Sequence, residues 1–199
     1  MGPYYRPDMK IAIIQGHPDP AGGHFCHALA GAYADGSRRA GHEVEMVEVA
    51  QHTFSLLRSQ HEFEHQSVPD ALRAAQERIG WAEHLVFVYP LWLGTMPALL
   101  KGFLEQVYRP GFAFDARPGQ RWAQGLSGRS ARIVVTMGMP AFVYRWYFGA
   151  HSLKSLERNV LRFVGIKPVR ASVIGSVEVS AAARERWLEK MRRYGAQAR

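Results

Sequence analysis

Residues 86–102 read VFVYPLWLGTMPALLKG, and this stretch predicts more of the fold than any other. An apolar run stops at Pro90, a short loop with Trp92 and Gly94 follows, and a helical pattern restarts at Pro97. Proline suits the first turn of a helix, because the N–H that it lacks would have no partner there. The pattern therefore predicts a buried strand, a binding loop and a helix, in that order.

Residues 11–30 repeat this layout. The run IAIIQ stops at GHPDPAGG, and an amphipathic helix follows. Continuous rather than alternating hydrophobicity is typical of a strand that is covered on both faces. Two strand-to-helix loops of this kind suggest a ligand that lies across the carboxyl ends of a parallel sheet.

The other apolar patterns complete a series of five strands that alternate with five helices. Strands are expected over 10–15, 43–49, 84–89, 131–136 and 169–174, and helices over 25–40, 69–82, 97–108, 153–164 and 181–194. Residues 51–67 are interpreted as a surface excursion, and Gly and Pro forbid a long helix in the aromatic-bearing insertion 109–128. The series indicates one doubly wound α/β domain.

The length of 199 residues fits one domain, which we expect to span 9–199 after a disordered N-terminal extension over 1–8. No apolar stretch approaches the roughly 20 residues that cross a bilayer. The first residues, MGPYYRPD, lack the apolar core of a signal peptide, so we expect a cytoplasmic protein. The single cysteine, Cys26, agrees with that compartment.

The net charge of +8 invites comparison with nucleic-acid-binding proteins. Lys and Arg are spread along the chain rather than gathered in a run, and no nucleic-acid motif accompanies them. We therefore expect no nucleic-acid partner, and favour an anionic small molecule as the ligand of a basic surface.

The first loop places His17 just past a strand and Ala21, Gly22 and Gly23 just before a helix. Free N–H groups at a helix start can hold a phosphate, and His17 can donate to it. Neither GxGxxG nor GxxxxGK[ST] is present. A histidine beside a turn can equally be a structural hydrogen-bonding residue.

The second and third loops carry groups that suit a planar, reducible ring. Backbone N–H groups of residues 90–93 can read the edge of a heterocycle while Trp92 covers its face. In the third loop, which contains Gly138, Tyr144 and His151 could relay a proton. The alternatives are a Trp that packs in the core and Tyr and His side chains that cap loop ends.

Three histidines in the surface excursion, His52, His61 and His65, give only a weak metal signal, because no cysteine accompanies them. A GxSxG nucleophile elbow is absent, so hydrolase chemistry lacks support. We expect no metal.

Three pieces of the chain resemble the NAD(P)H:quinone oxidoreductase branch, the DT-diaphorase-like family, of the flavodoxin-like superfamily. They are IAIIQGHPDP with the following HFCHALA, then YPLWLGTMPALLKGFLEQVYRPGFAF, then TMGMPAFVYRWYFGAH, in that order. The resemblance implies a flavodoxin-like three-layer sandwich with a five-stranded parallel sheet of order 2-1-3-4-5.

By this resemblance, two groups of residues would hold a flavin and a third would carry the chemistry. The phosphate and ribityl chain would lie among His17, His24, Phe25 and Cys26, although the family commonly has Ser and Asn where His24 and Cys26 stand. The isoalloxazine ring would lie against Pro90, Leu91, Trp92 and Leu93. Residues 136–139 correspond to the family's TTGG, with Thr136 and Gly138 retained, and Tyr144 and His151 would take the family's active-site roles.

The implied activity is two-electron reduction of a quinone-like acceptor by NAD(P)H through a bound flavin, with FAD slightly favoured over FMN. Family members are generally homodimers with the site at the interface, and the insertion around Phe112, Phe114 and Trp122 would contribute to it. The alternative is a regulatory, flavin-binding ancillary subunit of a membrane transporter of the potassium-efflux type, in which association with the membrane is peripheral.

Overall fold

The sheet at the centre of the molecule has five parallel strands in the order β2-β1-β3-β6-β7. The computed structural model describes residues 8–115 and 123–199. The strands are β1 (Lys10–Gln15), β2 (Glu43–Glu48), β3 (His84–Pro90), β6 (Ser130–Thr136) and β7 (Val169–Ile174). With β6 and β7 as the fourth and fifth strands of this sheet, the expected order 2-1-3-4-5 is confirmed.

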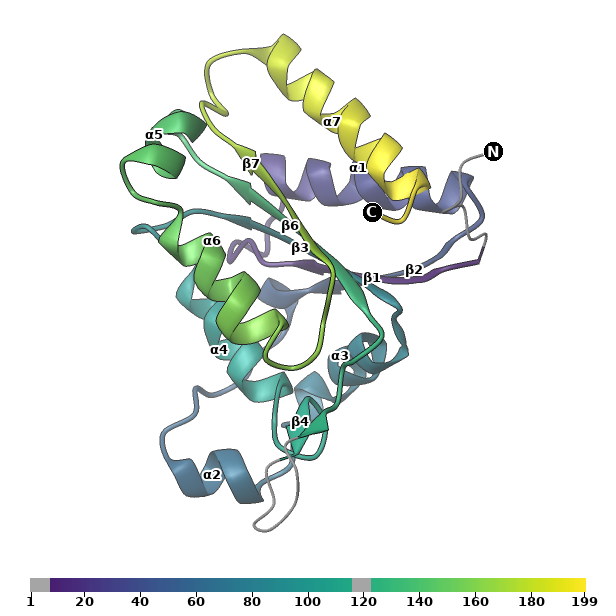
Figure 1. Cartoon of the computed structure of the whole chain (residues 1–199), viewed down its shortest axis with the longest axis vertical. Coiled ribbons are helices and arrows are strands. Elements are labelled where there is room, and N and C mark those ends of the chain that lie inside the picture. The colour runs from purple at the N-terminus through teal and green to yellow at the C-terminus, as the bar shows by residue number, and fades with distance from the viewer. Residues whose placement is uncertain (1–7, 116–122) are drawn as a thin grey trace.

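Helices cover both faces of the sheet, as Figure 1 shows. One face carries α1 (Phe25–Arg39) and α7 (Ala181–Ala196). The other carries α3 (Asp70–Trp81), α4 (Ala98–Val107) and α6 (His151–Ser155), which continues as the π-helix η2 (Leu156–Leu161).

The two faces follow from the period of two in a strand. In β1, Ile11 and Ile13 pack under α1, whereas Ala12 and Ile14 pack with α3 and α4, and all four side chains are fully buried. Both faces of the strand are therefore apolar, which is why its hydrophobic pattern is continuous.

Glycine permits the close crossing of α1 and α7. A Cβ atom at Gly36 would lie 1.9 Å from the carbonyl oxygen of Arg192. The crossing fixes the position of α7 above the sheet.

Two short helices and a hairpin lie in segments that the sequence pattern left irregular. They are α2 (Gln60–His65), α5 (Ala141–Trp146) and the antiparallel pair β4 (Phe114–Asp115) and β5 (Ala123–Gln124), and a 3-10 turn, η1 (Val49–Gln51), follows β2. α2 has no buried residue and therefore no apolar periodicity. It is stabilised locally, because the Ser59 hydroxyl accepts from the N–H of Glu62 at 3.1 Å.

The expected extension over 1–8 falls almost entirely on residues 1–7, and Trp122 lies in 116–122; both segments are outside the described residues. Within the part that the structure describes, no helix has the length and apolar character needed to cross a membrane.

Candidate functional site

A pocket of about 420 Å³ opens where β1, β3 and β6 end. This is the edge at which doubly wound sheets bind ligands. The pocket brings together residues from all three predicted loops and the start of α7, and its lining is His17, Gly23, His24, Phe25, Cys26, Pro90, Leu91, Trp92, Thr136, Met137, Gly138, Val177, Glu178 and Arg184.

The first loop presents a fixed hydrogen-bond donor to this pocket. The backbone N–H of Asp19 donates to Nδ1 of His17 at 3.2 Å, so the proton of the neutral imidazole is on Nε2. His17 is only 7% exposed, and burial is the main reason that its pKa falls from 6.5 to about 4. Its ring is therefore neutral at physiological pH, with Nε2–H as a donor.

The start of α1 lies beside this donor. Gly22 and Gly23 have φ values of 75° and 77°, a left-handed conformation that glycine adopts without strain. The N-cap residue His24 does not cap the helix with its side chain, and the first turn contains no acidic residue. The helix start therefore offers its N–H groups to an anion.

The second loop is a tight turn that follows β3 and is hydrogen-bonded to the end of β6. The N–H of Leu91 donates to the carbonyl of Thr136 at 2.7 Å, and Trp92 and Thr95 exchange two backbone hydrogen bonds of 2.9 and 3.0 Å. Trp92 is half-exposed, and its ring meets His17 edge-on at 5.9 Å. Leu93 differs from its neighbours, because its φ is 46° and its fully exposed side chain lines an adjacent cavity instead.

Cys26 and Thr136 join the first helix to the third loop. The Cys26 thiol and the Thr136 hydroxyl are 3.2 Å apart, and both side chains are buried. Burial raises the pKa of the thiol to about 11, so Cys26 is a protonated wall residue and not a nucleophile.

Tyr144 and His151 lie in a neighbouring cavity of about 250 Å³, lined by Leu91, Gly94, Met139, Tyr144, Phe148, His151 and Ser152. Leu91 lines both cavities, so the two adjoin. Tyr144 is buried; its phenol oxygen accepts from the N–H of Leu153 at 3.1 Å and lies 2.7 Å from the Ser152 hydroxyl. His151 is exposed.

The sequence patterns missed Val177, Glu178 and Arg184, which follow β7. Arg184 donates to the carbonyl of Val177 at 3.0 Å, and this bond ties the start of α7 to the loop before it. Topology is the signal that points to these residues, because every parallel strand, β7 included, ends at the same edge of the sheet.

The three histidines of residues 51–67, His52, His61 and His65, do not line this pocket. Nδ1 of His52 is 3.0 Å from the carbonyl oxygen of Ala71, and His61 stacks on His65 across one face of α2 with ring centroids 4.8 Å apart. Nowhere in residues 8–115 and 123–199 do three His, Cys, Asp or Glu residues form a group that could hold a metal ion.

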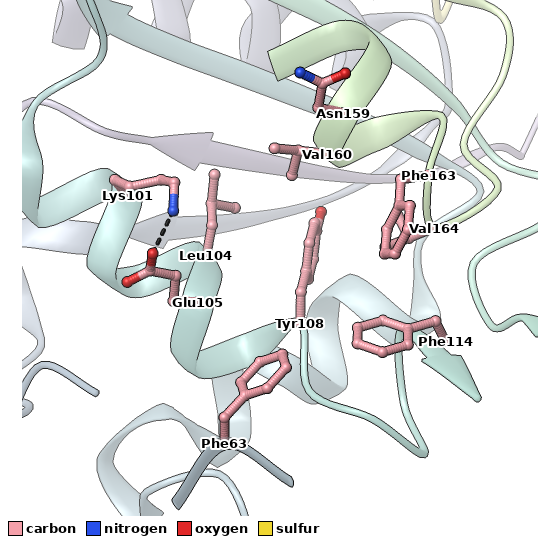
Figure 2. Close-up of a pocket in the computed structure, with 10 residues that line it drawn as sticks. All are labelled: Phe63, Lys101, Leu104, Glu105, Tyr108, Phe114, Asn159, Val160, Phe163 and Val164. Atoms are coloured by element: carbon pink, nitrogen blue, oxygen red, sulfur yellow. Dashed lines mark hydrogen bonds and ion pairs between the residues drawn. The ribbon is translucent and has the colours of Figure 1, made fainter. Parts of the chain in front are cut away.

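Another cavity, of about 290 Å³, lies between α4 and η2, and Phe63 of α2 lines it as well. Figure 2 shows the Lys101–Glu105 ion pair at one side of it and the rings of Phe63, Tyr108, Phe114 and Phe163 toward the other. The Tyr108 hydroxyl is buried and has no hydrogen-bond partner among the described residues.

Comparison with known proteins agrees with this geometry. An uncharacterised NAD(P)H oxidoreductase of Haemophilus influenzae is 25% identical over 86% of this chain and 86% of its own length. Human ribosyldihydronicotinamide dehydrogenase [quinone] is 29% identical over 60% of this chain, which spans only about half of that relative (53%).

A structure of an NAD(P)H:quinone oxidoreductase from Methanothermobacter marburgensis superposes with a TM-score of 0.81 at 27% identity, over 95% of this chain and 98% of that one. The family profile described as flavodoxin-like fold matches residues 9–198. The resemblance stated from the three loops is confirmed, and the chain belongs to the family of proteins with the flavodoxin-like fold.

Proposed function

We propose that this protein is a flavin-dependent reductase that uses NAD(P)H to reduce a quinone-like acceptor by two electrons. The observation that carries the proposal is the pocket at the ends of β1, β3 and β6, in which three separate loops meet. The names of the matched proteins from Methanothermobacter marburgensis and human, both of which include quinone, support the same reaction class.

The residues of the pocket fit a flavin. His17 Nε2–H and the start of α1 suit a phosphate, and the half-exposed Trp92 beside Leu91 suits an apolar ring. FAD is slightly favoured over FMN by analogy with the quinone reductases that the chain resembles. A flavin bound here would supply the two-electron exchange between NAD(P)H and the acceptor.

The adjoining cavity of Tyr144 and His151 is the proposed place of the acceptor. The exposed His151 imidazole can give a proton to a reduced quinone oxygen, and the Ser152 hydroxyl links the cavity to the buried Tyr144 phenol. The side chains of Leu91, Met139 and Phe148 supply an apolar lining to the same space.

We also propose a homodimer with the site at the interface. Aromatic side chains of α5 and the turn after it are exposed, with 65% for Phe142, 86% for Trp146 and 83% for Tyr147. Exposed apolar surface of this extent marks an interaction site. A second copy would bury these rings, together with the aromatic cavity of Figure 2, which Phe114 lines.

The test is spectroscopic. Purified protein should carry flavin absorbance that bleaches with NADH or NADPH and returns when a quinone is added. Protein that takes up neither FAD nor FMN refutes the proposal. Co-purification with a membrane transporter that persists after the flavin is removed would instead favour the ancillary-subunit function.

A further inference from the structure

Two stacked imidazoles and a third beside them surround the start of α1. The rings of His17 and His24 are 3.9 Å apart at an interplanar angle of 14°, and the ring of His27 is 5.3 Å from His17 and 5.7 Å from His24. The cluster therefore brings three imidazole rings together at the edge of the pocket, which His17 and His24 line.

The hydrogen bonds of His24 determine what it can offer to an anion. Nε2 of His24 lies 2.7 Å from a carboxylate oxygen of Asp19. Because the bond to His24 is the main reason that the pKa of Asp19 is lowered, the carboxylate is ionised and only accepts, so Nε2 carries a proton. In a neutral His24 ring, the other nitrogen, Nδ1, then presents a lone pair; only a protonated ring presents Nδ1–H.

His17 offers a donor in either case. Its Nδ1 accepts from the Asp19 N–H, so Nε2–H is a donor at neutral pH, and that group has no hydrogen-bond partner among the described residues. The two stacked rings therefore differ in one respect: His17 can bind an anion as it stands, whereas His24 must first take up a proton.

We propose that His24 couples binding of the cofactor's phosphate to the uptake of one proton, so that this protein holds phosphorylated flavins more tightly as the pH falls. The inference rests on the proposed function, because it assumes that the pocket holds a flavin. It assigns His24 as a determinant of specificity for the phosphorylated cofactor, with Asp19 as the residue that positions its ring.

Burial disfavours the protonated form of the two rings beside His24. Burial, followed by the charge of His24, lowers the pKa of both His17 and His27, so these two rings remain neutral when His24 is charged. The carboxylate of Glu48 in β2 acts in the opposite direction and raises the pKa of His27, but burial and the charge of His24 outweigh it. From the α7 side, the basic Arg184 and the acidic Glu178 line the pocket.

The direction of the effect follows from linkage. An anionic phosphate beside His24 stabilises the protonated ring, and therefore the protonated protein binds the phosphate more tightly. One charge-assisted hydrogen bond gained on protonation corresponds to about a tenfold change in affinity.

The experiment compares FAD with riboflavin between pH 8 and pH 6, by quenching of flavin fluorescence on binding. Riboflavin has the same ring and no phosphate, and the diphosphate of FAD keeps its charge over this range. We expect the Kd for FAD to fall about tenfold from pH 8 to pH 6 and the Kd for riboflavin to change less than about twofold.

The variant His24→Asn keeps a donor for Asp19 but cannot be protonated. It should bind FAD at both pH values with the affinity of the wild type at pH 8, while His61→Asn, on the exposed helix α2, should keep the wild-type pH dependence. Equal pH dependence for FAD and riboflavin, or an unchanged dependence in His24→Asn, overturns the inference and leaves the proposed function intact. Failure to bind any flavin at either pH overturns both.

Discussion

Replacing Tyr144 with phenylalanine separates a structural from a catalytic role of the phenol. The Tyr144 oxygen accepts a hydrogen bond from the N–H of Leu153. In Tyr144→Phe this oxygen is absent, so the N–H of Leu153 is left buried without that partner. The expected loss is about 1–3 kcal/mol of unfolding free energy, which lowers the melting temperature of a chain of this size by roughly 2–12 °C. Differential scanning calorimetry measures this loss.

The same variant tests the proton relay. If Tyr144 supplies a proton through Ser152, Tyr144→Phe should lower quinone turnover by about 10²-fold while flavin absorbance persists. Ser152→Ala is the matched control for stability, because it removes the hydroxyl that lies 2.7 Å from the phenol and keeps the acceptor for Leu153. Full turnover by Tyr144→Phe despite a lower melting temperature would refute the relay, and an unchanged melting temperature would refute the hydrogen-bond argument.

Three further predictions concern separate parts of the molecule. His151→Ala should slow quinone reduction by about 10²-fold in steady-state assays with flavin still bound, and normal turnover would exclude it from proton transfer. The pKa of His84 is lowered from 6.5 to about 3, mainly by burial, so its contribution to stability is full above pH 6.5 and is lost as the pH falls toward 3. Urea unfolding should therefore show a steeper loss of stability on acidification for the wild type than for His84→Gln, and parallel curves would contradict this. Gly36→Ala should cost about 1–3 kcal/mol by pushing the carbonyl of Arg192 away, whereas Gly31→Ala, with nothing within 4 Å of its added Cβ, should cost nothing in the same unfolding assay; equal effects would refute the close crossing of the helices.

The sheet could be predicted from sequence because its three central strands, β1, β3 and β6, are buried on both faces and the edge strand β7 is buried over its second half. The run IAIIQ and the segment 169–174 are apolar enough to mark β1 and β7, and β7 has the expected bounds of Val169–Ile174. The short helices α2 and α5 were not predicted, because they bury few side chains. α2 buries no side chain and α5 buries only Tyr144, so neither leaves a helical pattern in its apolar residues.

The site was predictable in part for a similar reason. His17 and Trp92 follow strands with strong apolar patterns, Thr136 ends another such strand, and all three line the pocket. Arg184 lies within α7, about ten residues after β7, and nothing in its local pattern distinguishes it from the other arginines of that helix. Only the arrangement of the strands in space brings it to the same edge.

The central claim is that the three loops form the flavin site, and a crystal structure of the protein with FAD tests it most directly. We predict electron density for the isoalloxazine ring against residues 90–92, with the phosphates at His17 and the start of α1. A flavin ring in the aromatic cavity between α4 and η2, or density that avoids the loops after β1 and β3, would contradict it.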